Sequence, residues 1–156
     1  MNEKATASTT GNGELLITMS YPAEPFDSSP DANQLESAVL ENTFYRRVLY
    51  TSKHGDHQQV AMSVDKKIPA EVHDDVDQYF LVKKGKGYCI VDGKTTKLRR
   101  LSAFWVERGS SHEIHSTSKR PLKLFVSYAP AHHPKGRVDE FNVDLREQKI
   151  TCKLFG

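Results

Sequence analysis

Hydrophobic and polar positions alternate along most of the chain from residue 42 onward. Short runs rich in Val, Ile, Phe and Tyr are separated by Gly, Asp and Lys, and the runs recur roughly every 8–12 residues. Asp92-Gly93 is a strong two-residue hairpin signal. With no helical period in between, the pattern predicts an all-β sandwich or small barrel rather than a parallel α/β sheet. The predicted strands are 45–51, 58–64, 70–72, 78–82, 87–91, 95–98, 104–106, 112–116 and 122–128.

The first part of the chain differs in composition from the rest. Residues 1–13 are small and polar, so we expect disorder there, because such a segment buries too little surface to offset its ordering entropy. A short strand is predicted at 15–19, a proline-containing loop at 22–31 and one or two helical turns at 33–40. We therefore divide the chain into three parts: a largely disordered tail with a short strand or helix (1–41), a domain (42–145) and a C-terminal extension (146–156).

The charge balance narrows the class of partner. The 156 residues include 22 basic and 20 acidic ones, for a formal net charge of +2. This balance gives no electrostatic footprint for nucleic acid or an anionic membrane. We expect a small molecule as the partner, and a homodimer is compatible with a chain of this kind.

Two cysteines and the absence of apolar segments bear on the compartment. Cys89 lies in an apolar run and is expected to be a small buried hydrophobe, and Cys152 is near the end of the chain. Two such cysteines do not make a disulfide framework, so a reducing compartment is favoured. The sequence shows neither a secretory leader nor a run of about 20 apolar residues, and we expect a cytoplasmic protein.

Four residues carry the candidate chemistry. Glu71 and His73 are two positions apart, so in a strand their side chains point to the same face. Gln78 follows after a polar turn, and His112 begins a later predicted strand behind Gly109. Carboxylate oxygen and imidazole nitrogen are ligands for Zn, Ni, Mn or Fe(II), while an amide oxygen is a weaker ligand.

At these residues the sequence resembles the cupin superfamily. The first cupin segment has two ligands separated by one residue, a third after four more and a glycine after six more, which Glu71, His73, Gln78 and Gly85 match. Gly109 and His112 match the glycine and histidine of the second segment. The resemblance covers about 42–140. It implies a double-stranded β-helix, or jelly-roll barrel, with Glu71, His73, Gln78 and His112 holding one divalent transition metal.

The sequence around these positions resembles one branch of the superfamily, the small single-domain cupins described as phosphomannose-isomerase-like. The chain departs from the usual cupin pattern at two of the four ligand positions, because Glu71 stands where most members have histidine and Gln78 where most have glutamate. The second segment also lacks its usual leading glycine, its proline and its asparagine, which are replaced by Leu101, Glu107 and Ser116. These replacements concern turn geometry more than ligation.

Several residues have a plainer interpretation beside the functional one. Gln78 is either a ligand or a buried amide bonded to its neighbours. Glu113, His115 and Tyr88 are candidates for a base beside the metal, although His115 is expected on the opposite strand face from His112. His132-His133 either covers the barrel mouth or forms a surface loop, and the run 97–100 is too short and isolated to indicate nucleic-acid binding.

The resemblance leaves three functions open. The first is isomerisation or epimerisation of a sugar or sugar phosphate, in which the metal holds adjacent oxygens while a side chain moves a proton. The second is Fe(II)-dependent dioxygenase chemistry, which two histidines and a carboxylate suit. The third is a binding module without catalysis, since one fold hosts many activities.

Overall fold

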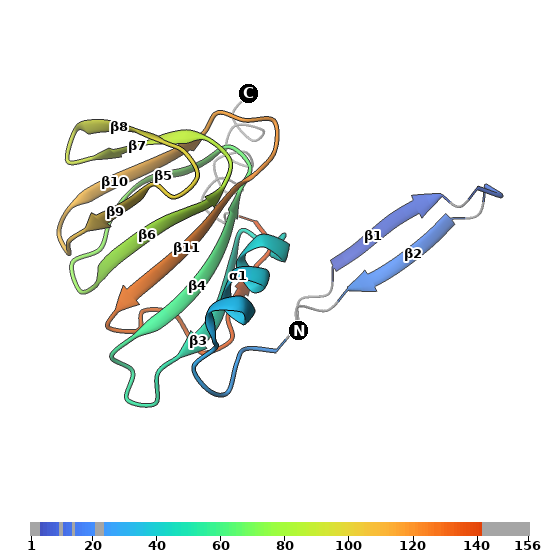
Figure 1. Ribbon diagram of the computed structural model, residues 1–156, viewed down its shortest axis with the longest axis horizontal. Helices are drawn as coiled ribbons and strands as arrows, with labels where there is room; N and C mark the ends of the chain where they lie inside the picture. Colours follow the sequence, from blue (N-terminus) through green and yellow to red (C-terminus); the bar gives the residue numbers. More distant parts are fainter. Residues whose placement is uncertain (1–3, 10, 14, 21–23, 142–156) are drawn as a thin grey trace, which may run out of the picture.

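Two antiparallel sheets face each other and form the body of the protein (Figure 1). The computed structural model describes residues 4–9, 11–13, 15–20 and 24–141. The larger sheet has six strands in the order β12-β3-β4-β11-β6-β9, and the smaller has four in the order β5-β10-β7-β8. The bounds are β3 Arg46–Thr51, β4 Gln58–Val64, β5 Lys67–Val72, β6 Asp77–Lys84, β7 Gly87–Val91, β8 Lys94–Leu98, β9 Ala103–Val106, β10 Ser111–Ser116, β11 Leu122–Ala129 and β12 Val138–Asp139.

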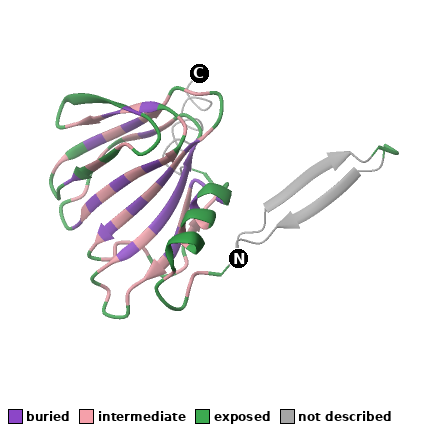
Figure 2. Ribbon diagram, in the orientation of Figure 1, coloured by how far each residue is buried: buried purple, intermediate pink, exposed green. Residues whose placement is uncertain are grey.

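The core lies between the two sheets, and the alternation in the sequence explains it. Along β6 and β11 every second side chain is buried and the intervening ones are less covered (Figure 2). The inward positions of β11 are Leu122, Leu124, Val126 and Tyr128, which are at most 1% exposed. Burying each aliphatic side chain of this size stabilises the fold by about 1.5–3 kcal/mol. The predicted all-β barrel is confirmed.

The predicted strands correspond closely to the observed ones, with two informative exceptions. β5 begins at Lys67, three residues before the predicted start at 70. The prediction began too late because Pro69 and the charged residues before it are typical of a turn. Pro69 is tolerated since β5 is the edge strand of the smaller sheet. The two-residue β12 was not predicted, and it pairs with β3 through Val138 and Arg47.

The N-terminal region differs from the expected disorder. β1 (Lys4–Thr9) pairs antiparallel with β2 (Leu15–Ser20), and Figure 1 shows this hairpin projecting away from the barrel. The strand predicted at 15–19 is confirmed, and residues 4–9 form the strand that pairs with it. Composition indicates how much surface a segment can bury, whereas this hairpin is formed by backbone pairing between the two strands. An isolated two-stranded hairpin gains little stability from such pairing.

A helix joins the expected tail to the barrel. α1 (Ala32–Glu41) begins with a capping box, in which Asp31 accepts from the backbone of Gln34 and the Gln34 side chain accepts from the backbone of Asp31. The helix packs on the outer face of the larger sheet, where Val39, Leu49 and Ala61 form a second buried cluster. The helix predicted at 33–40 is confirmed, and it belongs with the barrel rather than with a free tail.

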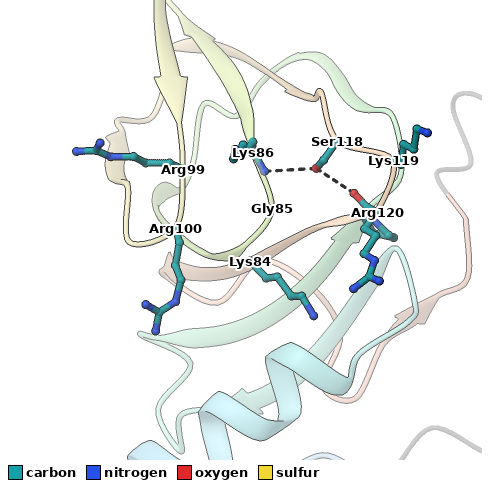
Figure 3. Close-up of a pocket in the computed structure, with 9 residues that line it drawn as sticks. Lys84, Gly85, Lys86, Arg99, Arg100, Ser118, Lys119 and Arg120 are labelled. Atoms are coloured by element: carbon teal, nitrogen blue, oxygen red, sulfur yellow. Dashed lines mark hydrogen bonds between the residues drawn. The ribbon is translucent and has the colours of Figure 1, made fainter.

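The barrel has two ends of different character. The turns β5–β6, β7–β8 and β9–β10 meet at one end, which carries the predicted ligands. The connections β6–β7, β8–β9 and β10–β11 meet at the other, around a pocket of about 550 Å³ (Figure 3). In the β8–β9 connection Leu101 has φ +69°, the left-handed conformation that favours glycine. This is the position at which the cupin pattern usually has a glycine, so the substitution retains the turn at a cost of about 1 kcal/mol in backbone strain.

Three further expectations concern single features. Cys89 is buried, as predicted, while Cys152 and the extension 146–156 lie outside the described residues. Among the residues that the structure describes, no helix combines the length and the apolar character needed to cross a bilayer.

Candidate metal centre

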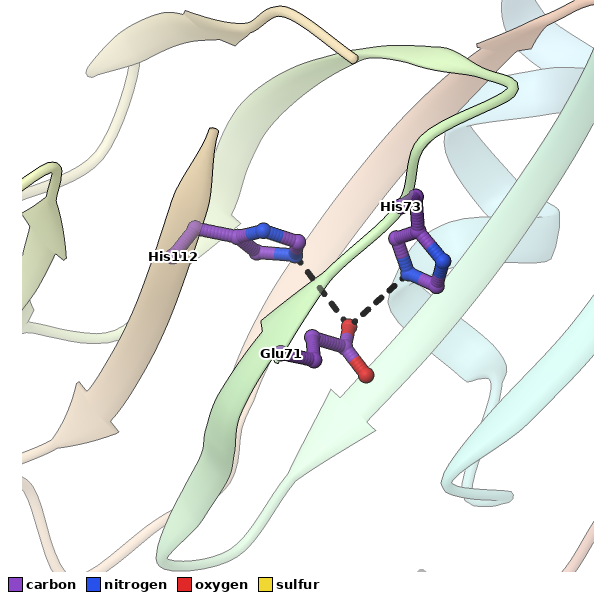
Figure 4. Close-up of side chains that lie close together, drawn as sticks. All are labelled: Glu71, His73 and His112. Carbon is purple, nitrogen blue, oxygen red and sulfur yellow. Dashed lines mark hydrogen bonds and ion pairs between the residues drawn. The ribbon is translucent and has the colours of Figure 1, made fainter. Parts of the chain in front are cut away.

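Three of the four predicted ligands converge at one end of the barrel (Figure 4). Oε1 of Glu71 lies 3.1 Å from Nε2 of His112 and 3.4 Å from Nε2 of His73. Each of the three residues offers one ligand atom, and these atoms all lie within 4.8 Å of one another. His112 is fully buried, whereas Glu71 and His73 are 26% and 20% exposed in their side chains. The site therefore has a closed side formed by His112 and a side that solvent can reach.

Strand pairing brings these residues together. β10 pairs with β5 so that His112 lies directly opposite Glu71, and cross-strand partners have neighbouring side chains. His73 follows immediately after β5 and is two residues from Glu71, which keeps the imidazole on the same side as the carboxylate. A register shift after His112 breaks the ladder between the two strands, at the point where the site is built.

Backbone and ionic contacts hold the surrounding turns in place. Asp77, at the end of the acidic turn, accepts hydrogen bonds from the backbone, Nε and Nη2 of Arg108 at 2.9–3.1 Å. Gly109 donates its N–H to the carbonyl of His73 at 2.7 Å, and its φ of +82° is readily adopted by glycine. These bonds join the turn before β6 to the loop before His112. Asp77 therefore stabilises the polar turn before β6.

The electrostatics of Glu71 favour a carboxylate. Burial alone would raise its pKa, but hydrogen bonds and charge interactions with His112 and His73 outweigh burial and lower the pKa to about 2. The ionised form that a metal requires is therefore present at neutral pH. Nδ1 of His112 is buried and has no hydrogen-bond partner among the described residues.

Gln78 lies in the barrel interior close to this end. It is 1% exposed, and neither its amide nitrogen nor its carbonyl oxygen has a hydrogen bond of ordinary geometry among the described residues. The amide still lies near the Tyr128 hydroxyl. Burial raises the pKa of this hydroxyl, and the interaction with Gln78 partly opposes the rise. Phe80 lies on the same face of β6, with its ring 5.8 Å from that of His112. Two buried, unpartnered polar atoms are costly, so this side chain is suited to an additional partner.

The suggested bases on β7 and β10 do not reach the site. His115 lies on the other face of β10, where its Nε2 contacts Glu113 at 2.5 Å and its ring stacks on Tyr88 at 4.5 Å. The strand period placed His115 correctly on the opposite face from His112. The suggestion that Tyr88, Glu113 or His115 acts beside the metal is therefore wrong.

The loop after β11 contains His132 and His133, for which the sequence left two positions open: over the barrel mouth or in a surface loop. The ring of His132 lies 4.8 Å from that of His73 and stacks on Tyr128, so the loop covers the site. Burial is the largest cause that lowers the pKa of His132, and this favours a neutral ring at pH 7. The loop is held by Gln58, whose Oε1 accepts from the backbone of His132 and His133 and whose Nε2 donates to the His133 carbonyl.

A cation also lies near the interior, which the sequence analysis missed. Arg46 on β3 is paired with Asp139 at 2.8 Å, and its side chain is only 16% exposed. Burial raises the pKa of the Tyr128 hydroxyl and the charge of Arg46 opposes that rise, so Arg46 acts on the polar groups around Gln78. Nothing in the strand pattern distinguishes this inward arginine from an outward one, and only the barrel closure shows it.

The donor set fits a divalent metal ion. One carboxylate oxygen and two imidazole nitrogens already lie within a few ångströms of one another, and the unpartnered amide of Gln78 lies in the same interior. Zn, Mn, Ni and Fe(II) all accept such oxygen and nitrogen ligands. The cluster of Glu71, His73 and His112 could therefore hold one ion.

The chain is similar in sequence to a known protein family and to two known proteins. A sequence model of the cupin domain matches residues 59–128. The uncharacterized protein YrkC of Bacillus subtilis is 30% identical over 135 residues, covering 83% of this chain and 70% of that protein. A protein of Acanthamoeba polyphaga mimivirus is 38% identical over 107 residues, covering 65% of this chain and 66% of that protein. The chain thus spans about two thirds of the length of these relatives.

A solved structure extends the comparison to the fold. The crystal structure of BH2720 from Bacillus halodurans superposes with a TM-score of 0.69 at 30% sequence identity. The match covers 76% of this chain and 94% of that one. The similarity therefore includes nearly the whole of the second protein.

Proposed function

Since the chain belongs to the cupin superfamily, we propose that it holds one divalent transition metal through Glu71, His73, Gln78 and His112 and acts on a small molecule there. The observation that carries the proposal is the convergence of one carboxylate and two imidazoles on a point that is buried on one side and accessible on the other. A purely structural site would have no need of the accessible side.

Each residue has a distinct part in this proposal. Glu71 supplies the negative charge that offsets a dication, and its low pKa keeps it ionised. His112 is a fixed ligand because it is fully buried beside Phe80, while His73 lies toward solvent. Gln78 contributes a neutral oxygen, the weakest of the four donors. When bound, a divalent metal polarises a carbonyl or hydroxyl oxygen and orients adjacent oxygens of a ligand.

We place isomerisation or epimerisation of a sugar or sugar phosphate first among the reactions. Such a reaction moves a proton, and it needs a side chain at the mouth of the site. His132 is placed for this, since its ring contacts His73 while 25% of its side chain is exposed.

A second candidate is Fe(II)-dependent oxygenation. The observation that favours it is the ligand type, because two histidines and one carboxylate are the set that non-haem Fe(II) oxygenases use. The two reactions differ in what they consume, so they are readily separated by experiment.

The test begins with metal-stripped protein reloaded separately with Zn, Mn, Ni and Fe(II). Each form is incubated with a panel of sugars and sugar phosphates in deuterated water, and substrate deuteration is followed by NMR. Incorporation that is lost in His132→Gln, which still binds metal, supports the isomerase. Oxygen uptake that only Fe(II) supports favours the oxygenase.

Two further outcomes bear on the proposal. Saturable ligand binding that needs metal, without deuteration or oxygen uptake, points to the binding module and overturns the enzymatic part. Failure of every metal to bind at the site overturns the whole proposal.

A further inference from the structure

Basic side chains gather around the pocket at the end of the barrel opposite the ligands. Six of the residues that line it are lysine or arginine, and none is acidic. They come from the end of β6 and from the connections β6–β7, β8–β9 and β10–β11, which lie far apart in the sequence. The six are Lys84, Lys86, Arg99, Arg100, Lys119 and Arg120.

The backbone of these connections is held by specific contacts. Gly85 has φ +99°, and a Cβ there would come within 3.1 Å of the Leu122 backbone, so glycine permits the close approach. Ser118 accepts from the backbone of Lys86 through Oγ and donates to the carbonyl of Arg120 (Figure 3). Thr117 donates its N–H to the Lys86 carbonyl at 3.0 Å. The basic residues are therefore carried on a fixed frame.

Among the residues that the structure describes, no carboxylate neutralises these six charges. None of the six forms an ion pair with another residue in the described part of the chain. A carboxylate near the pocket, that of Glu36, is already paired with Lys83 at 2.8 Å, although Arg100 also lowers its pKa. In Figure 3 the side chains of Lys84, Arg100 and Arg120 extend to the same side of the pocket, whereas Arg99 and Lys119 point away from it.

We propose that this pocket is an anion site for a small ligand that carries two or more phosphate groups. Lysine and arginine form strong charge-assisted bonds to phosphate, and arginine does so with two parallel donors. A volume of about 550 Å³ lies within the range of small-molecule pockets. Several unpaired cations around one concavity repel each other, and a ligand with several negative charges relieves that repulsion.

The anion site is separate from the metal centre. β6 runs from Gln78 at one end to Lys84 at the other, and six residues of strand span about 20 Å. A compact ligand fits the site better than a nucleic acid does, because a nucleic acid contacts basic residues along an extended stripe. Here the six basic residues line one pocket rather than a stripe, and the net charge of the chain is only +2.

The experiment titrates tripolyphosphate into the full chain by calorimetry, at about 50 and 150 mM salt. We expect saturable binding at one site, weakened at the higher salt concentration. The variant Lys84→Gln/Arg100→Gln/Arg120→Gln should lose at least tenfold in affinity. The control Lys53→Gln/Lys94→Gln/Lys135→Gln removes the same charge from exposed lysines elsewhere and should bind nearly as the wild type does. Arg99→Gln/Lys119→Gln should lose less than the first variant.

Because all the substitutions are on exposed side chains, thermal unfolding of each variant shows that it is folded before it is titrated. Equal loss of affinity in the first variant and the control would overturn the proposal, since it would indicate a diffuse charge effect. Binding that only the metal-loaded chain shows would overturn it as well, because the phosphate would then lie at the metal. Tighter binding of a single-stranded oligonucleotide than of tripolyphosphate would replace the small-ligand site by a nucleic-acid surface.

Discussion

The two ends of the barrel use polar residues in opposite ways. At the metal end the polar groups are buried or half-buried and are positioned by strand pairing, as in His112 opposite Glu71. At the basic end the charges are exposed on connections, and the backbone beneath them is fixed by contacts such as that of Gly85 with Leu122. Buried polar groups affect stability strongly when a partner is lost, whereas exposed charges affect it little. The two ends should therefore respond differently to ligands, substitution and pH.

Metal removal should produce the largest difference between the ends. Stripping with a chelator should lower the free energy of unfolding by about 4 kcal/mol relative to protein with free metal 1,000-fold above its Kd. The triple variant at the basic end, Lys84→Gln/Arg100→Gln/Arg120→Gln, should show the same metal-dependent change as the wild type. Urea unfolding with and without metal measures both. An equal free energy of unfolding in metal-loaded and metal-stripped wild type would contradict the expected difference between the two ends.

Two buried glutamines provide a matched pair within the barrel. Gln58 makes hydrogen bonds to Thr51 and to the backbone of His132 and His133, whereas Gln78 makes none of ordinary geometry. In metal-free protein Gln58→Leu should cost about 2–4 kcal/mol, because it leaves backbone groups of the His132 loop unpaired. The free energy of unfolding of Gln78→Leu should be within about 1 kcal/mol of the wild-type value or higher than it. Chemical denaturation gives both values, and a reversed order would be inconsistent with a ligand role for Gln78.

Acid should weaken the metal end through His133. Burial, followed by the positive charge of Arg46, lowers its pKa from 6.5 to about 3. The unfolded chain takes up this proton as the pH falls below 6.5 and the folded chain does not until about pH 3, so stability is lost across that window. His133→Phe retains a ring beside Tyr128 and removes the titration.

This substitution should reduce the loss of stability between pH 6.5 and 3 by about 1–2 kcal/mol, a range that allows for partial exposure of the ring. Unfolding of the metal-free chain at a series of pH values measures it. The same pH slope in wild type and variant would show that His133 does not titrate in this way.

The smallest effect concerns the backbone at the basic end. Leu101 is 60% exposed and has φ +69°, so its side chain contributes little while its conformation is strained. Leu101→Gly should therefore be more stable than Leu101→Ala by about 1 kcal/mol, since both remove the side chain and only glycine relieves the strain. Differential scanning calorimetry resolves this difference. A more stable alanine variant would mean that the turn has another conformation.

Local patterns in the sequence predicted most of the barrel. Alternation located β4 and β7 to the residue, and the two-residue spacing placed Glu71 and His73 on one face. Local patterns cannot give contacts that depend on closure of the barrel. The proximity of His132 to His73 is one such contact, and the inward direction of Arg46 is another.

The basic pocket shows the same limit on a larger scale. Arg99 and Arg100 stand in a short run that indicated nothing by itself, because its companions Lys84 and Arg120 are distant in sequence. The connections of neighbouring strands meet only after the sheets have formed. In contrast, the ligand spacing around Glu71 is local and could be recognised directly. Whether Gln78 completes the set remains a prediction, since its unpartnered amide is consistent with ligation without showing it.

The metal content of four proteins tests the central claim most directly. Wild type, His73→Ala, His112→Ala and His115→Ala are stripped with a chelator, reloaded with one metal, desalted and analysed by mass spectrometry. His115 is the control, because it lies on the outer face of β10 only three residues from His112. Wild type and His115→Ala should retain about one ion per chain, and the other two should retain almost none. Full metal content in folded His73→Ala and His112→Ala would contradict the assignment.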